Sequence, residues 1–197
     1  MTHPFVKIPL EKRKAVFLIA LFATLALMIT LYVLGEPLKE KDPNKLPKDL
    51  AAHNGIMSYE FAKTPECAQQ IIDYWQTAGL RQKAITHFLI DYLYLMAYPI
   101  SIGMVCVGLG FSLREKACLR LATLGLWLSW GQLVAGLCDA VENALLLQML
   151  WQVSANASMQ ISRMFTIIKF TLVIAGLLYI YTGAIILGTQ KFIATRN

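Results

Sequence analysis

The chain has 197 residues, of which 57% are hydrophobic and 15% are charged, and its mean hydropathy is +0.54. A water-soluble core of this size cannot bury so much apolar surface, so the composition excludes an ordinary soluble domain. The formal net charge is +6, but no basic stripe with interleaved aromatic residues occurs, and we therefore expect no nucleic-acid partner.

Four apolar segments are each long enough for a helix to cross about 30 Å of hydrocarbon. None of them alternates at period two, as the strand of a membrane β-barrel would. We therefore predict an all-α membrane protein, a bundle of four transmembrane helices forming a single domain over residues 1–197. The predicted spans are about 15–35, 84–111, 117–151 and 164–188.

The first span follows a basic cluster at 12–14 and is interpreted as a retained signal anchor, because its apolar stretch is too long for a cleaved signal peptide. Lys and Arg are denser in segments 1–14, 112–120 and 188–197 than in the segments on the other side of the spans. This bias predicts a multi-pass protein of the plasma membrane with both termini on the cytoplasmic side.

The long outer loop, 36–83, divides into a Lys/Pro/Asp-rich linker at 36–49 and a predicted amphipathic helix. Thr64 is a candidate N-cap, Pro65 suits the first helical position, and Gly79 can end the helix. Its apolar face consists of Ala68, Ile71, Ile72, Trp75 and Ala78. A second short amphipathic turn precedes it, with Ile56, Met57, Tyr59, Phe61 and Glu60. Simple packing of the loop and a lid over the bundle are equally good readings of these segments.

Each of the last three spans has a polar face when its residues are placed at about 100° per residue. On the second span this face consists of His87, Asp91, Tyr94, Tyr98 and Ser101. On the third it consists of Gly125, Ser129, Gln132, Gly136, Asp139 and Asn143, with Glu142 beside it. On the fourth it consists of Ser162, Thr166, Lys169 and Gly176, with Arg163 near the outer end.

The ionisable members of these faces all lie within about three turns of the outer helix ends. Charged side chains inside spans are costly, so a shared depth on three polar faces predicts one site that faces the bundle interior. The candidate acid and base groups are Asp139, Glu142 and Asp91. The candidate ligand-binding residues are Asn143, Tyr94, Tyr98, Lys169, His87 and Gln132.

Three other readings of this layer stay open. The same residues can be ion pairs that fix helix register, which makes the protein a structural or assembly subunit of a larger membrane complex. A small proton-coupled transporter is another, although the charge lies near one face only. A divalent metal site is chemically possible, but no His or Glu spacing supports it and Lys169 would oppose a cation, so we predict no metal.

Three motifs resemble an uncharacterised family of bacterial four-span membrane proteins. They are Tyr59-Glu60-Phe61-Ala62, then Asp91-Tyr92 with Tyr98, and finally Gly136-x-x-Asp139-x-x-Glu142-Asn143-x-x-Leu146, whose Asp-x-x-Glu-Asn element is the most specific. The resemblance covers about residues 55–150. It implies a bacterial inner-membrane location and a four-helix fold, and it implies no activity.

The reading that best fits these patterns is an outer-facing pocket, polar at the top and apolar below, which binds or modifies a lipid or small hydrophobic molecule. Whether the protein is an enzyme stays open. We expect no cofactor, and we expect membrane lipids as partners, with a protein partner or a homo-oligomer as the alternative.

Overall fold

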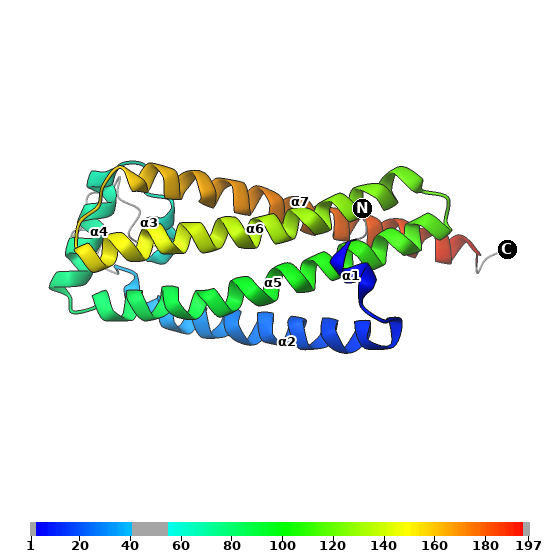
Figure 1. Ribbon diagram of the computed structural model, residues 1–197, viewed down its shortest axis with the longest axis horizontal. Helices are drawn as coiled ribbons and strands as arrows, with labels where there is room; N and C mark the ends of the chain where they lie inside the picture. Colours follow the sequence, from blue (N-terminus) through cyan, green and yellow to red (C-terminus); the bar gives the residue numbers. More distant parts are fainter. Residues whose placement is uncertain (1–2, 41–54, 195–197) are drawn as a thin grey trace. The chain divides into compact units, whose positions relative to one another are not determined.

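A computed structural model describes residues 3–40 and 55–194, and it describes side chains as far as residue 189. Within these residues the chain is helical and contains no strand (Figure 1). The part of the predicted linker from residue 41 onward lies outside the described residues. The elements are α1 (Pro4–Lys7), α2 (Leu10–Gly35), the 3₁₀ helix η1 (Glu36–Leu38), α3 (Ile56–Glu60), α4 (Pro65–Thr77), α5 (Arg81–Glu115), α6 (Leu119–Gln152) and α7 (Ser158–Ala194).

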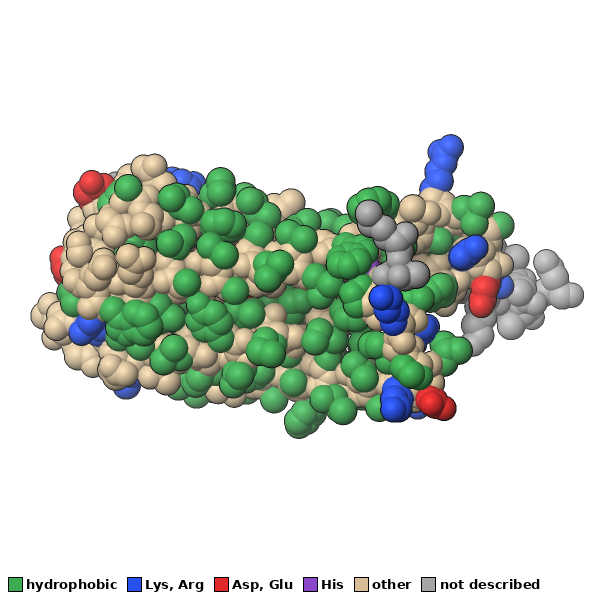
Figure 2. Space-filling view, viewed as in Figure 1, with side chains coloured by type: hydrophobic (Ala, Val, Ile, Leu, Met, Phe, Trp, Pro, Cys, Tyr) green, Lys and Arg blue, Asp and Glu red, His purple; other side chains and the backbone are tan. Residues whose placement is uncertain are grey.

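Four of these helices, α2, α5, α6 and α7, are long and apolar enough to cross a membrane. They also expose large apolar side chains, such as Phe22 at 75% and Trp127 at 67%. Figure 2 shows hydrophobic side chains along the exposed helix faces and charged side chains near the helix ends. A soluble domain would leave this much apolar surface in water, so the pattern is that of a multi-pass membrane protein.

The long helices extend beyond most of the apolar segments from which they were predicted, because polar residues at the segment ends continue the same helices. One boundary was wrong. The third span was predicted to begin at Ala117, but Ala117 has a φ of 61° and belongs to the turn, so α6 begins at Leu119. A positive φ is incompatible with an α-helical position.

The contacts within the described chain define two compact units, and each long helix contributes to both. Unit 1 comprises Met1–Phe22, Met96–Gly136 and Lys169–Asn197, and unit 2 comprises Ala23–Leu95 and Leu137–Ile168.

In unit 1 the helices α5, α6 and α7 approach closely at Gly125. A Cβ atom added at Gly125 would lie 2.3 Å from the Tyr179 hydroxyl and 2.7 Å from the main-chain oxygen of Cys106. Only glycine leaves room for these atoms, which agrees with the close approach expected of small residues between membrane helices. The side chains of Cys106, Leu113 and Tyr179 form the buried apolar cluster of this unit.

Unit 2 holds η1, α3 and α4 together with segments of α2, α5, α6 and α7. Its buried apolar cluster is larger and includes Tyr59, Trp75 and Phe88. The Trp75 ring is fully buried, meets the Tyr59 ring edge-on at 5.3 Å, and donates a hydrogen bond from Nε1 to the Leu38 main-chain oxygen at 3.0 Å. Trp75 therefore ties α4 to both η1 and α3.

The helix α4 is also fixed to the turn between α6 and α7. The Gln69 side chain donates to the Val153 oxygen and accepts from the Ala155 main-chain N–H at 2.7 Å. Arg81, the first residue of α5, donates to the main-chain oxygens of Leu150 and Trp151 in the last turn of α6. The Gln69 bonds therefore hold α4 to the turn after α6, and the Arg81 bonds hold the start of α5 to the end of α6.

The start and end of α4 follow ordinary capping chemistry. Thr64 Oγ1 accepts from the Cys67 main-chain N–H at 3.3 Å, and Pro65 occupies the first turn, where its missing N–H costs nothing. The helix ends before Gly79, whose φ of 67° is available to glycine without strain. The side chains of Ala68, Ile71, Ile72 and Trp75 are buried, whereas Ala78 is exposed.

Candidate functional site

The polar faces of α5, α6 and α7 point into the protein, while apolar side chains of the same helices face outward. Of the nine predicted site residues, all except Tyr94 are buried, and Tyr94 is half-buried. Buried polar side chains require partners, because an unmade hydrogen bond in an apolar environment costs about 1–3 kcal/mol. The partners of these residues therefore define what the layer is built to do.

The central contact joins α5 to α6 within unit 2. Asn143 Nδ2 donates a hydrogen bond of 2.7 Å to Asp91 Oδ2, and both side chains are buried. On the same two helices, the hydroxyl of Tyr92, the residue after Asp91, donates to the Ala140 main-chain oxygen at 3.1 Å. Asp91 and Asp139 both lie within electrostatic range of the Tyr92 hydroxyl. The structure thus brings together Asp91, Asn143 and Asp139, as the polar faces predicted.

The depth of these residues is similar on each helix. Asp91 lies ten residues after the start of α5, Glu142 lies ten residues before the end of α6, and Thr166 lies eight residues after the start of α7. At a rise of 1.5 Å per residue, these positions are about 12–15 Å from the helix ends that adjoin α4. Together with Asp139 and Asn143 they form what we call the acidic layer of unit 2.

The short helix α3 belongs to this layer, which the sequence did not reveal. The Tyr59 hydroxyl donates to the Leu146 main-chain oxygen at 3.2 Å, and Thr166 Oγ1 donates to the Glu60 main-chain oxygen at 3.3 Å. Glu60 itself is buried. These contacts link residues 87 and 106 positions apart in the chain, so no local pattern encodes them. The available signal was the placement of Glu60 within the Tyr-Glu-Phe-Ala motif.

Buried charge in unit 2 is mostly negative. Five carboxylate side chains are less than 10% exposed, namely Glu40, Glu60, Asp91, Asp139 and Glu142. No Lys or Arg among the described residues of unit 2 is buried to that degree, and Arg163 is half-buried, but Lys169, the residue of α7 directly after this unit, is 6% exposed. The described residues also hold no three His, Cys, Asp or Glu side chains arranged to bind a metal ion. The carboxylates therefore share a layer without converging on one point.

Two buried oxygen atoms of uncharged side chains in unit 2 lack hydrogen-bond partners among the described residues. They are Asn143 Oδ1, whose amide nitrogen is bonded to Asp91, and Ser162 Oγ, one turn before Thr166 on α7. Both side chains are 0% exposed. A buried polar atom without a partner calls for an explanation, and an additional bound molecule is one that fits a site with several acceptors.

Of the remaining predicted residues of α5, His87 and Tyr94 belong to unit 2 and Tyr98 belongs to unit 1. His87 belongs to unit 2 and packs beside α2, where a Cβ added at Gly35 would lie 3.5 Å from His87 Nε2. Tyr98 is buried in unit 1, where its main-chain oxygen accepts a hydrogen bond from the Ser101 hydroxyl at 3.0 Å.

Gln132 and Lys169 also belong to unit 1. Gln132 Nε2 donates to the Leu172 main-chain oxygen at 2.8 Å, and Gly176 leaves space for this amide, because an added Cβ would lie 2.5 Å from Nε2. Lys169 Nζ lies 5.3 Å from the centre of the Phe170 ring. Gln132 therefore has a clear role in joining α6 to α7.

Comparison with protein-family models, with curated proteins and with solved structures finds no match to this chain.

Proposed function

We propose that this protein is a multi-pass membrane protein that binds a lipid or other small hydrophobic molecule through the acidic layer of unit 2. The observation that carries the proposal is Asn143, which is fully buried and bonded through its nitrogen to Asp91, while its oxygen has no partner among the described residues. A bound molecule that donates a hydrogen bond to this oxygen would remove the energetic cost of burying it.

The chemistry of the layer restricts the polar end of that molecule. Asn143 Oδ1 is an acceptor, carboxylates accept hydrogen bonds when ionised, and the Ser162 hydroxyl can accept as well as donate. Among the described residues, five carboxylate side chains and one Lys or Arg side chain, Lys169, are less than 10% exposed. The matching ligand group is therefore a donor, either a hydroxyl or an ammonium, and the rest of the ligand is apolar.

Where the ligand is chemically modified, we assign Asp139, Glu142 and Asp91 as the acid and base groups. Their proximity to an amide that can orient a substrate is the arrangement that general acid–base catalysis requires. A protein that only binds the ligand would use the same residues. A catalytic role and a binding role therefore differ in whether a chemically modified product forms.

The finer placement of the chain is part of the proposal. The basic residues near α1 and in the turn between α5 and α6 favour both termini on the cytoplasmic side of a bacterial inner membrane. The acidic layer and α4 then face the outer side, and the exposed charged face of α4 lies toward water. Labelling of single cysteines placed at exposed positions 63 and 116 with a membrane-impermeant reagent tests this orientation, which requires labelling of intact cells at 63 only.

A pair of serine variants tests the binding proposal. Ser162→Ala removes a buried hydroxyl that has no partner among the described residues, whereas Ser129→Ala removes a buried hydroxyl that donates to the Gly103 main-chain oxygen at 2.9 Å in unit 1. Native mass spectrometry of gently extracted protein would report co-purified small molecules in both. We expect Ser162→Ala to retain less ligand with unchanged thermal stability, and Ser129→Ala to keep its ligand but lose about 0.6–1 kcal/mol of stability. Equal ligand retention in both variants and in the unmodified protein would refute the proposal.

A structural role is the second candidate, favoured by the interhelical bonds of the layer. Asn143 to Asp91, Tyr92 to the Ala140 oxygen and Tyr59 to the Leu146 oxygen together fix the register of three helices. If this is the only function, Asn143→Leu will unfold the protein or release a partner chain, and no small molecule will be found in the unmodified protein.

A further inference from the structure

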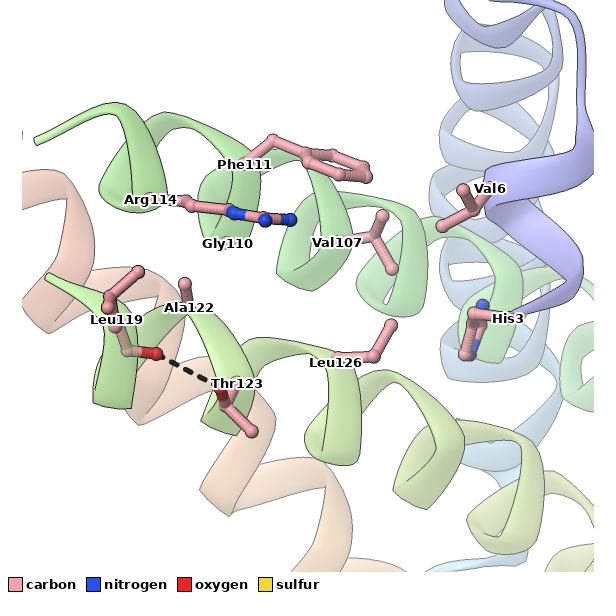
Figure 3. Close-up of a pocket in the computed structure, with 10 residues that line it drawn as sticks. All are labelled: His3, Val6, Val107, Gly110, Phe111, Arg114, Leu119, Ala122, Thr123 and Leu126. Carbon is pink, nitrogen blue, oxygen red and sulfur yellow. Dashed lines mark hydrogen bonds between the residues drawn. The ribbon is translucent and has the colours of Figure 1, made fainter. Parts of the chain in front are cut away.

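A cavity of 470 Å³ lies in unit 1, lined by α1, α5 and α6 (Figure 3). Most of its lining is apolar, with Val6 from α1, Val107 and Phe111 from α5, and Leu126 from α6. Three polar side chains, His3, Arg114 and Thr123, also line it. None of its lining residues belongs to the acidic layer, so this cavity is independent of the proposed function.

His3 is built into the wall of the cavity. It is 1% exposed, its ring packs edge-on against Trp130 at 4.6 Å, and Nδ1 accepts the Phe5 main-chain N–H at 3.2 Å as the cap of α1. Because Nδ1 is the acceptor, Nε2 carries the proton in the neutral ring. Nε2 forms no hydrogen bond of ordinary length and angle with a described residue. This nitrogen has almost no accessible surface, and the main-chain group of Ser129 lies near enough to the ring to influence its pKa, so His3 shapes the cavity wall.

Arg114 supplies charge at the same cavity. Figure 3 shows its side chain extending beside Phe111 toward Val107, over the apolar wall. Arg114 is exposed to solvent at its other side, so the guanidinium can meet a group that stays at the water boundary.

A second cavity of 400 Å³ shares Val107 and Phe111 with the first. Arg13, Lys14 and Phe17 of α2 are part of its lining. The Arg13 guanidinium lies 5.9 Å from the centre of the Phe111 ring, and its nitrogens donate to the Val6 and Ile8 main-chain oxygens at 2.7 and 2.9 Å. Arg13 thus holds the chain around α1 in place between the two cavities.

The charge around the two cavities is strongly positive. Residues 3–14 and 111–120 contain two acidic side chains, Glu11 and Glu115. The basic side chains of the same segments are Lys7, Lys12, Arg13, Lys14, Arg114, Lys116 and Arg120. Positively charged hydrogen-bond donors at the rim of the cavities suit a phosphate group. The apolar walls of the cavities suit acyl chains attached to that phosphate.

We propose that these two cavities bind one anionic phospholipid. Its phosphate oxygens accept hydrogen bonds from the exposed Arg114 guanidinium, and its two acyl chains occupy the two cavities on either side of Val107 and Phe111. The lipid fastens the chain around α1 to α5 and α6.

The test is a titration of the detergent-extracted full chain by native mass spectrometry. The ligands are dioleoylphosphatidylglycerol, dioleoylphosphatidylcholine with the same acyl chains, and inorganic phosphate. We expect the glycerol lipid to bind more tightly than the choline lipid, and inorganic phosphate not to displace it. Equal binding of the two lipids, or displacement by phosphate at millimolar concentration, would overturn the assignment of an anionic lipid.

Two variants and a matched control locate the site. Arg114→Gln should weaken binding of the glycerol lipid about fivefold, the effect of removing one charge near an anionic headgroup. Arg120→Gln removes the same charge from an exposed position that lines neither cavity, and it should change binding less than twofold. Val6→Phe fills the first cavity from a half-buried position and should abolish the preference for the glycerol lipid. Equal effects of the two arginine variants, or unchanged binding in Val6→Phe with helical content retained, would show that the lipid binds elsewhere.

Discussion

The hydrogen bond between Asn143 and Asp91 gives the sharpest test of the acidic layer. Asn143 is fully buried and its Nδ2 lies 2.7 Å from Asp91 Oδ2. A hydrogen bond to a carboxylate contributes about 1.5–3 kcal/mol in soluble proteins. Side-chain bonds between membrane helices average about 0.6 kcal/mol and reach about 1.7 kcal/mol. The short distance and complete burial favour the upper part of that range, so we expect a coupling energy of about 1.5 kcal/mol.

The coupling is measured by a double-mutant cycle of Asp91→Ala and Asn143→Ala. Unfolding would be followed by circular dichroism in mixed micelles, with increasing sodium dodecyl sulfate as the denaturant. The control cycle combines Asp91→Ala with Ser129→Ala, because Ser129 bonds to Gly103 in unit 1, and these two effects should add within about 0.5 kcal/mol. A coupling below about 0.3 kcal/mol between Asp91 and Asn143 would refute the view that their bond organises the layer.

Three further outcomes follow from other parts of the chain. Burial lowers the pKa of His3 below its usual 6.5, and the main-chain group of Ser129 partly opposes this shift. The state in which α1 is docked is therefore favoured above pH 6.5 and weakens as the pH falls below it. Trp130 fluorescence should report this change, and His3→Asn, which keeps a capping acceptor, should remove it. Trp75→Ala should lower the free energy of unfolding by about 3–5 kcal/mol. Trp75→Phe should lower it by about 1 kcal/mol, since the smaller ring keeps most of the packing and loses one hydrogen bond. A similar loss of stability in thermal unfolding for both variants would contradict this. Gly125→Ala should lower the melting temperature, because the added methyl group meets neighbouring helices at less than 3 Å. Gly188→Ala places its methyl group in open space and should be neutral or stabilising by up to about 1 kcal/mol. An unchanged melting temperature for Gly125→Ala would show that the helices can separate there.

Local sequence patterns located the helices well because they are encoded by neighbours in the chain. The long apolar segments predicted the four helices that the structure shows to be long and apolar enough to cross a membrane. The spacing of polar residues at about 100° per residue predicted which faces of α5, α6 and α7 are buried, and Asp91, Asn143 and Asp139 lie on those faces. Where a backbone conformation overrode composition, at Ala117, the boundary was misplaced.

Contacts between distant segments were not encoded in this way. The bond from Thr166 to the Glu60 oxygen places α3 in the acidic layer, and the Trp75 bond to the Leu38 oxygen fixes α4 to η1. Periodicity describes one helix at a time, so it cannot show which residue of a loop meets which turn of a helix. His3 is the clearest case, because its burial against Trp130 and its place in a cavity depend on a short helix that has no strong sequence signal.

The sequence by itself therefore determined the membrane character of the chain and the polar face of each long helix, because hydrophobicity and helical period are local properties. Only the tertiary structure decided that Asn143 bonds to Asp91 while leaving its own oxygen without a described partner, and that Gln132 belongs to a different unit from the acidic layer. The physical reason is that the partner of a buried polar atom is set by how helices pack, and packing is a property of segments far apart in the chain.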